Sequence, residues 1–362
     1  MQTDLTNATP KLPHSPATRA GFAVLPFFEK KTFMPVLFRS LAVFLSLGLA
    51  APSALAGENE REPQIVTISF DGAHDVAQWK RSRALARETG ARFTYFLSCV
   101  FLLSKETRAT YAGPGKKPGQ SNVGFAETKA EVAERLEQIW QARHEGHEIA
   151  SHGCGHFDGK DWSAADWGKE FTQFRTILTD AYKINDIEGE PLGWRGFAET
   201  GISGFRAPYL SVNAGLAEAL VADGIKYDAS SVSRGPAAPR RKGGLWHFAL
   251  PLIPEGPEGR RVIAMDYNWF VRHSDAVEQP DTDGRFEARS YRALMDAFEA
   301  EYDGARTPLQ VGLHFTLMNG GAYWRALERF AREVCGKDEV RCVGYDELVK
   351  TLEAKTGEPV GG

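Results

Sequence analysis

The chain has 362 residues and a formal net charge of −4 at pH 7, with 43 Lys and Arg residues against 47 Asp and Glu residues. The first 56 residues hold five of the basic and two of the acidic residues, so the remainder carries a formal charge of −7. A modestly acidic chain is a poor candidate for nucleic-acid binding, which needs a clustered basic face, and no nucleic-acid partner is expected. The basic cluster Arg240-Arg241-Lys242 is interpreted as a solvated loop.

Residues 34–56 have the pattern of an export signal. Arg39 supplies a positive charge, residues 41–49 form a short apolar run, and Ala54-Leu55-Ala56 is a small-residue cleavage site. The apolar run is too short for an ordinary transmembrane helix, which needs about 20 such residues. We therefore expect a secreted or periplasmic protein with no stable membrane span after cleavage. Residues 1–33 lack a clean apolar pattern and are interpreted as a misassigned start or a leader.

Residues 57–362 are expected to form a single domain in which short strands alternate with helices. Apolar residues recur at helical spacing in the helical stretches, and glycines at 90, 146 and 224 can end three of them. Alternation of this kind is typical of parallel strands joined by helices, and it predicts a barrel-like α/β fold. The predicted strands are 65–70, 92–97, the apolar run before His152, 204–206, 225–227, 262–265 and 309–313, and the predicted helices include 76–85, 132–140, 167–178 and 216–220.

Two stretches interrupt the alternation. Residues 111–122 are rich in Gly, Pro and Lys, and residues 233–259 are rich in Pro, Gly and Arg. Loops of this length in a compact domain are usually lids or surface insertions. Both are expected to overhang the functional site.

The residues that point most directly to chemistry are His152 and His156, two imidazoles four positions apart directly after a predicted strand. Asp71, Arg206 and His314 also follow predicted strands. In an α/β barrel, reactive groups gather where strands end and loops begin. A histidine pair alone is often an ordinary surface or core feature, whereas these polar strand ends together predict an enzyme with a metal site.

The four cysteines of an exported protein favour disulfides. Cys335 and Cys342 flank a short charged loop, which favours a local bridge. Cys99 ends a predicted strand and Cys154 lies between the two histidines, so a bridge between them would brace that loop if their strands are neighbours. The alternative, Cys154 as a zinc thiolate, is disfavoured because a residue two positions from each histidine cannot easily share their coordinating face.

The order of these motifs resembles the polysaccharide deacetylases of the NodB-homology type, carbohydrate esterase family 4. The resemblance extends over residues 65–317, and the histidine pair and the Arg-x-Pro-Tyr segment are its specific parts. It implies a distorted parallel β/α barrel that removes N-acetyl groups from chitin-like polysaccharides or peptidoglycan with one divalent metal. The matching motifs are Ser69-Phe70-Asp71-Gly72, His152-x-x-x-His156, Arg206-Ala207-Pro208-Tyr209, Tyr227-Asp228-Ala229-Ser230 and Leu313-His314.

The resemblance also implies roles for the hydrolytic centre. His152 and His156 would be metal ligands, and zinc, cobalt, nickel or iron suits such ligands, with zinc as the first expectation. Asp71 would be the base that takes a proton from water. Arg206 would hold Asp71 ionised through a bidentate pair. The backbone N–H of Tyr209 would bind the oxyanion.

The remaining roles concern the acid and the acetyl pocket. His314 would protonate the leaving amine, with Asp228 or Asp266 as the partner that tunes it. Trp246 and Leu313 would line the pocket for the acetyl methyl group. Structural alternatives are a helix cap for Asp71 and a core position for His314.

One position departs from the family pattern. The family usually has a second aspartate, the third metal ligand, where this chain has Gly72. The third ligand would then be Asp71 itself, or His74 or Asp75 from the next turn, and we favour Asp71 because Asp75 is expected to start a helix. With fewer ligands the site would hold a metal weakly.

Three functions therefore compete. The first is an exported, metal-dependent N-deacetylase of an amino-sugar polymer. The second is a non-catalytic carbohydrate-binding protein on the same fold, motivated by Gly72. The third is a hydrolase of another non-peptide C–N bond, such as a cyclic amide.

Overall fold

The central sheet is curled and mostly parallel. β1 lies between β9 and β2, and β3, β4, β5 and β7 follow β2 in parallel order. β10 pairs with the start of β1, while β6 and β8 run antiparallel to β7. In the computed structural model, which describes residues 61–356, the strands are β1 (Gln64–Gly72), β2 (Thr94–Leu97), β3 (Glu148–Ser151), β4 (Gly204–Phe205), β5 (Tyr227–Ser233), β6 (Arg240–Lys242), β7 (Leu245–Glu255), β8 (Arg260–Ile263), β9 (Leu309–His314) and β10 (Val340–Cys342). The predicted distorted parallel β/α barrel is confirmed.

A short contact joins the two ends of the curled sheet. Met265, just after β8, pairs with Gly312 of β9, and the Gly312 N–H donates to the Ala264 carbonyl at 3.0 Å. A side chain at position 312 would come within 2.7 Å of the Met265 methyl group, so glycine permits this approach. The contact brings the end of β8 and the start of the helix after it beside β9.

The helices begin at side-chain caps in several places. Asp75, Thr128, Ser163 and Asn213 each accept a hydrogen bond from a backbone N–H three residues further on. Gly90 follows the first helix in the left-handed conformation, as predicted. The helices are α1 (Val76–Thr89), α2 (Lys129–His144), α3 (Ala164–Thr179), α4 (Ala181–Ile184), α5 (Trp194–Thr200), α6 (Ala214–Ala222), α7 (Asp266–Ser274), α8 (Arg285–Asp303), α9 (Ala322–Val334) and α10 (Tyr345–Thr356), with 3-10 turns η1 (Cys99–Leu102), η2 (Arg108–Thr110), η3 (Pro208–Leu210) and η4 (Met318–Gly321).

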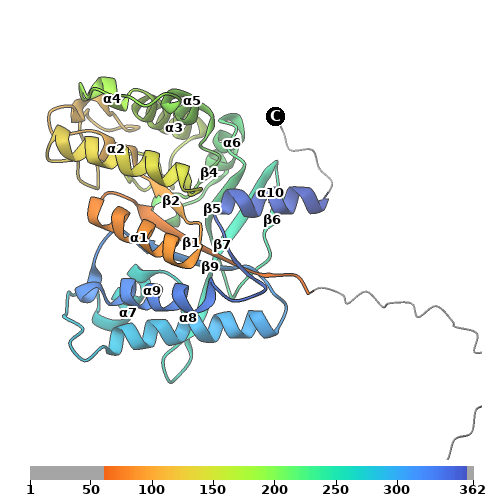
Figure 1. Ribbon diagram of the computed structural model, residues 1–362. Coiled ribbons are helices and arrows are strands. Elements are labelled where there is room, and N and C mark those ends of the chain that lie inside the picture. Colours follow the sequence, from red (N-terminus) through yellow and green to blue (C-terminus); the bar gives the residue numbers. More distant parts are fainter. Residues whose placement is uncertain (1–60, 357–362) are drawn as a thin grey trace, which may run out of the picture. The chain divides into compact units, whose positions relative to one another are not determined.

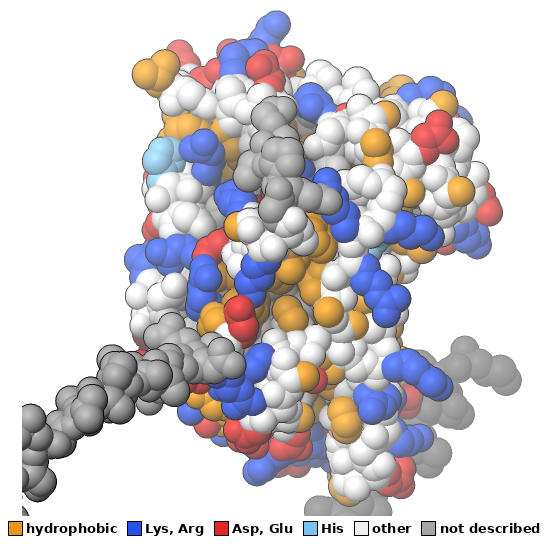
Figure 2. Space-filling model, turned by 90° about the vertical axis from the view of Figure 1, so that its right-hand side faces the viewer, with side chains coloured by type: hydrophobic (Ala, Val, Ile, Leu, Met, Phe, Trp, Pro, Cys, Tyr) orange, Lys and Arg blue, Asp and Glu red, His pale blue; other side chains and the backbone are white. Residues whose placement is uncertain are grey.

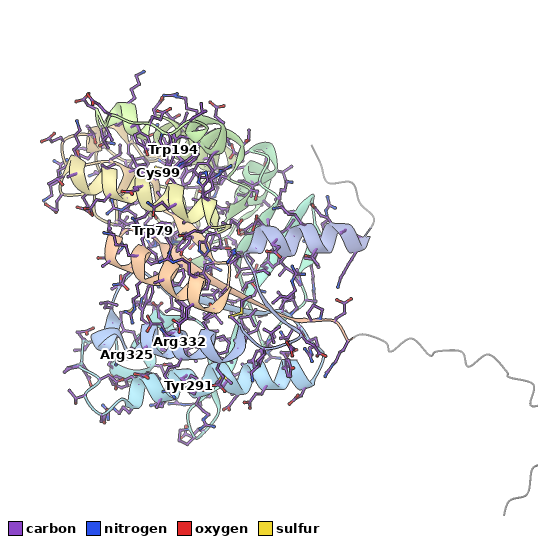
Figure 3. The ribbon with its side chains drawn as sticks, in the orientation of Figure 1. Trp79, Cys99, Trp194, Tyr291, Arg325 and Arg332 are labelled. Carbon is purple, nitrogen blue, oxygen red and sulfur yellow. A yellow bond between two sulfur atoms is a disulfide. The ribbon has the colours of Figure 1, made fainter. Side chains whose placement is uncertain are left out.

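The helices cover the sheet in two groups. Figure 1 shows α2 to α6 on one side, α7 to α9 on the other, and α1 between them. Figure 3 places Cys99 and Trp194 in the first group, and Tyr291, Arg325 and Arg332 on α8 and α9 in the second. The Arg325 guanidinium pairs with Glu287 of α8 at 2.7 Å, and Arg332 pairs with Glu88 of α1 at 2.8 Å. These ion pairs tie α9 to both of its helical neighbours.

The expectation of a long loop over residues 233–259 is wrong. This stretch contains β6 and β7, and β7 is a barrel strand parallel to β5. Its apolar side chains, including Leu245, Phe248, Leu250 and Ile253, are buried, and their burial outweighs the loop-like Pro and Gly content. The predicted parallel strand at 262–265 is also corrected, because β8 ends at Ile263 and runs antiparallel to β7.

The basic cluster forms β6, a short edge strand, rather than a loop. Arg240, Arg241 and Lys242 are exposed. On the face seen in Figure 2, basic side chains are spread among acidic and uncharged ones rather than gathered in one patch.

Two disulfides are present, and both were predicted. Cys99 bridges to Cys154 and Cys335 bridges to Cys342. The proposed leader and signal peptide at residues 1–56 lie outside the described residues. Within residues 61–356, every helix is too short or too polar to cross a membrane.

Candidate active site

A cavity of about 430 Å³ opens where the parallel strands end. Asp71 and His314 come from the ends of β1 and β9, which pair in register so that these two residues face each other across neighbouring strands. His152 and His156 follow β3, and Tyr209 lies in η3 after β4. All five residues line the cavity. The polar residues at the strand ends therefore lie around one cavity, as the sequence predicted.

A buried ion pair with Arg206 holds Asp71, the candidate base, in place. Nη1 of Arg206 lies 2.7 Å from Oδ1 of Asp71 and 2.9 Å from the Ser69 hydroxyl. Nη2 of Arg206 donates to the Tyr345 hydroxyl at 3.0 Å and Nε donates to the Ala229 carbonyl at 3.1 Å. The expected bidentate pair is therefore a single hydrogen bond to Asp71, because Tyr345 and Ala229 take the other donors. Arg206 does not line the cavity but lies fully buried behind it.

The charges around Asp71 decide its protonation. Burial raises the pKa of the Asp71 carboxyl. The positive charge of Arg206, with smaller effects of His152 and His314, lowers that pKa by more than burial raises it. The net pKa lies below the ordinary value. Asp71 is therefore a carboxylate at neutral pH.

The two histidines of the pair are neutral. His152 is buried, and its Nδ1 donates to the Arg206 carbonyl oxygen at 2.7 Å, which leaves Nε2 as the lone-pair nitrogen. Burial lowers the pKa of His152 to about 3, and burial also lowers the pKa of His156. Their ring centroids are 5.1 Å apart. A neutral imidazole whose second nitrogen is held by a carbonyl is the usual form of a metal-binding histidine.

His314 and Asp266 form a separate pair on the other side of the cavity. Nδ1 of His314 lies 2.7 Å from Oδ1 of Asp266, and the backbone N–H of His314 donates to Oδ2 of the same carboxylate at 2.8 Å. Burial lowers the pKa of His314, but the Asp266 carboxylate outweighs burial and raises that pKa to about 9. Asp266, in the first turn of α7, is thus the partner, whereas Asp228 hydrogen bonds to Ser230.

The loop at Tyr209 has an unusual backbone. Tyr209 and Leu210 both have positive φ, 58° and 54°, and His156 has φ 53°. Such values are rare outside glycine and are often found at functional sites. The Tyr209 ring lies 4.8 Å from the His156 ring and is 59% exposed. The role predicted for its backbone N–H stays a prediction.

Trp246 and Leu313 do not line the cavity. Trp246 packs in a buried cluster with Phe96 and Phe248, and Leu313 is fully buried in the main core. Because a strand's side chains alternate between its two faces, a position on a barrel strand does not guarantee access to the cavity. The apolar wall includes Leu210, Ile263, Met265 and Tyr267 instead.

The donor set for a metal is chemically suitable but not complete. Of the three alternatives for the third ligand, only Asp71 lines the cavity, because Asp75 caps α1 and the His74 ring packs against Phe101. Within residues 61–356, no three His, Cys, Asp or Glu side chains are arranged to hold an ion. The two neutral imidazoles fit a divalent metal, while Gly72 has no side-chain donor to offer.

Sequence reasoning missed the residue that supports the histidine loop. Glu170 of α3 is buried, and its Oε1 accepts hydrogen bonds from the backbone N–H groups of Cys154 at 2.7 Å and Gly155 at 3.2 Å. The Tyr111 hydroxyl donates to the same carboxylate at 2.8 Å. With the Cys99–Cys154 disulfide, these contacts fix the segment between the two histidines. A glutamate on a helix 14 positions after His156 gave no sequence signal of this role.

Several solved structures are similar to this chain. A probable polysaccharide deacetylase from Pseudomonas aeruginosa PAO1 matches at a TM-score of 0.50 and 16% identity, covering 84% of this chain and 99% of that one. A protein from Mycobacterium smegmatis, also described as a polysaccharide deacetylase, matches at 0.48 and 17%, covering 82% and 93%. A pseudoenzyme of carbohydrate esterase family 4 from Bacillus anthracis matches at 0.42 and 9%, covering 79% and 66%. Neither a family model nor a curated protein matches the sequence.

Proposed function

We propose that this protein is an exported N-deacetylase of an amino-sugar polymer, a chitin-like polysaccharide or peptidoglycan, belonging to the polysaccharide deacetylases. The observation that carries the proposal is that Asp71, held by Arg206, and His314, held by Asp266, line the same cavity, with the pKa of the first lowered and the pKa of the second raised. Amide hydrolysis needs a base that accepts a proton from water and an acid that donates one to the departing nitrogen. Groups whose surroundings drive their pKa values apart supply these two roles at one pH.

In the proposed reaction, Asp71 takes a proton from water while the water oxygen bonds to the acetyl carbon. Arg206 occupies Oδ1 of Asp71, so Oδ2 is the proton acceptor. Arg206 also holds the carboxylate in place against the strand ends. The buried pair therefore keeps the base both charged and oriented.

His314 completes the reaction. Asp266 holds Nδ1, so Nε2 carries the proton that passes to the amine nitrogen as the carbon–nitrogen bond breaks. The products are acetate and a free amino sugar. The apolar wall of Leu210, Ile263 and Met265 suits the acetyl methyl group.

A divalent metal, zinc first and cobalt, nickel or iron as alternatives, would be held by His152 and His156, and of the three alternatives for a third donor Asp71 is the one that lines the cavity. When bound, the ion supplies Lewis acidity for the acetyl carbonyl and for water. Export is supported by the signal pattern and by the two disulfides, which persist in oxidising compartments.

A second candidate function is carbohydrate binding without catalysis. The incomplete donor set, with no three suitable side chains gathered among residues 61–356, favours it. Both candidates place a sugar in the same cavity, and they differ in whether acetate is released.

The test is acetate release from N-acetylglucosamine oligomers, peptidoglycan and small cyclic amides, with zinc or cobalt added and metal content measured in parallel. We expect acetate and free amine in equal amounts from an amino-sugar polymer. Saturable sugar binding without acetate from a metal-loaded sample would support the binding protein instead. Release of product from the small amides alone would overturn the assignment of the substrate.

A further inference from the structure

The guanidinium of Arg206 joins the candidate base to helix α10. Nη1 donates to Oδ1 of Asp71 at 2.7 Å and to the Ser69 hydroxyl at 2.9 Å. The other terminal nitrogen, Nη2, donates at 3.0 Å to the hydroxyl of Tyr345, the first residue of α10. Within residues 61–356, Tyr345 is the one hydrogen-bond partner of Nη2. The side chain that holds Asp71 is therefore itself held from a helix 139 positions further along the chain.

The Tyr345 hydroxyl has a fixed orientation. It donates its proton to Oε1 of Gln310 in β9 at 3.1 Å, so its oxygen lone pairs are left for Arg206. The Tyr345 ring is fully buried in a cluster with Phe96 and Phe248. The guanidinium carbon of Arg206 lies 4.2 Å from the Phe96 ring centroid and 5.7 Å from the Tyr345 ring centroid. Two rings and the hydroxyl thus hold the guanidinium in one position.

The start of α10 is anchored to the amino ends of two barrel strands. The Tyr345 N–H donates to the Thr94 hydroxyl at 3.0 Å, and the Asp346 N–H donates to Oε2 of Glu148 at 3.1 Å. Thr94 begins β2 and Glu148 begins β3, and the Thr94 hydroxyl donates to the Glu148 carboxylate at 2.6 Å. Asp71 lies instead near the carboxyl end of β1. Tyr345 therefore reaches toward the candidate base from the opposite end of the barrel.

Loss of the Tyr345 hydroxyl would leave Nη2 of Arg206 as a buried donor without an acceptor. A buried unpaired donor is costly, so the guanidinium would turn toward another acceptor. Because Asp71 is joined to Arg206 through one hydrogen bond, its carboxylate would move with the guanidinium or lose that contact. Catalytic groups must be held within about 0.5 Å of their productive position, so even a small turn would lower the rate.

We propose that Tyr345 is a positioning residue that holds Asp71 in its productive orientation through Arg206. The inference rests on the proposed function, because it takes Asp71 as the base. Tyr345 does not line the cavity, so the inference assigns helix α10 a part in catalysis that acts only through Arg206.

The experiment compares Tyr345→Phe, which removes only the hydroxyl, with the matched control Tyr95→Phe. Tyr95 is also fully buried, but its hydroxyl donates to Ser82 at 3.0 Å and its ring packs against Trp79 of α1. Steady-state acetate release from N-acetylglucosamine trimer is measured for each zinc-loaded protein, together with the midpoint of urea denaturation.

We expect Tyr345→Phe to lower kcat roughly ten- to hundredfold with KM unchanged, since a misplacement of about 1 Å can cost about 100-fold. Tyr95→Phe should lower the denaturation midpoint to a similar degree and keep kcat. Equal losses of kcat in both variants, an unchanged kcat in Tyr345→Phe, or a rise in KM alone would overturn the positioning role.

A spectroscopic measurement separates this proposal from the proposed function. In metal-free protein with 15N-labelled arginine, a guanidinium held at both terminal nitrogens gives separate Nη1 and Nη2 signals, whereas a turning one gives an averaged signal. The Arg206 signals are assigned through nuclear Overhauser contacts to the Phe96 and Tyr345 rings. We expect separate signals in the unaltered protein and in Tyr95→Phe, and an averaged signal in Tyr345→Phe.

An averaged Arg206 signal in the unaltered protein, or separate signals in Tyr345→Phe, would refute the positioning. If acetate is never released, the deacetylase assignment fails, and the hold of Tyr345 on Arg206 is then decided by these signals alone. The spectrum of the unaltered protein needs no variant, so it keeps the test valid if Tyr345→Phe fails to fold.

Discussion

The contact between His314 and Asp266 sets the pH range of the proposed reaction. The carboxylate raises the pKa of His314 to about 9. The imidazole therefore stays protonated at neutral pH and loses its proton, and its role as the acid, as the pH rises through about 9. Asp266→Asn removes the charge that opposes burial, and the pKa of His314 should fall below its ordinary value. We expect the alkaline limb of the kcat/KM profile to move to lower pH by at least about two units, measured as acetate release against pH. An unmoved limb would mean that His314 is not the acid.

The charge of Arg206 is the second residue-scale feature that can be tested. The guanidinium of Arg206 is fully buried, 4.2 Å from the Phe96 ring centroid. Its positive charge compensates the negative charge of the buried Asp71 carboxylate. Arg206→Met leaves a buried carboxylate without a partner and should lower the free energy of unfolding by about 3 to 5 kcal/mol in urea denaturation.

The matched control for this variant is Arg195→Met, which removes a half-exposed arginine paired with Asp180 and Glu190. Exposed pairs contribute little, so the loss should be below about 1 kcal/mol. Similar losses in the two variants would contradict the account of the buried pair.

At the scale of elements, the two disulfides should contribute differently to the free energy of unfolding. The Cys99–Cys154 bridge closes a separation of 55 residues, and Cys335–Cys342 closes one of 7. The chain-entropy argument gives a stabilisation of about 4 kcal/mol for the long loop and about 2 kcal/mol for the short one. Replacing each pair by alanines and measuring urea denaturation tests this order, and a larger effect of the short loop would be evidence against it. Only loss of the Cys99–Cys154 bridge should also weaken zinc binding, because it braces the histidine loop.

The sequence predicted most helices and parallel strands because their apolar residues recur with clear periods and their ends carry caps such as Asp75 and Gly90. It failed at β7, where Pro251 and Pro254 lie inside a strand. The pairing of β7 with β5 ends at Pro251, so Pro254 has a strand partner only in β8. Composition indicated a loop, while burial against the barrel decided the outcome.

At the scale of the whole molecule, the site joins residues far apart in the sequence. Asp71 and Arg206 are separated by 135 positions and meet through one hydrogen bond. The rule that parallel strands end on one side of a barrel predicted this meeting. The rule could not decide whether Asp266 or Asp228 is the partner of His314. It also gave no sign that Glu170 supports the histidine loop or which side chains line the cavity. These features depend on strand register and on the face that each side chain occupies.

The most direct test of the central claim is acetate release from N-acetylglucosamine trimer by the zinc-loaded protein and by Asp71→Asn. The substitution keeps the size of the side chain and removes the base, and general base catalysis typically contributes a factor of about 100 to 10,000. We predict stoichiometric acetate and amine from the unaltered protein, and a loss of that order in Asp71→Asn with sugar binding retained. Equal rates for the two proteins, or no acetate from either at full zinc occupancy, would contradict the assignment as a deacetylase.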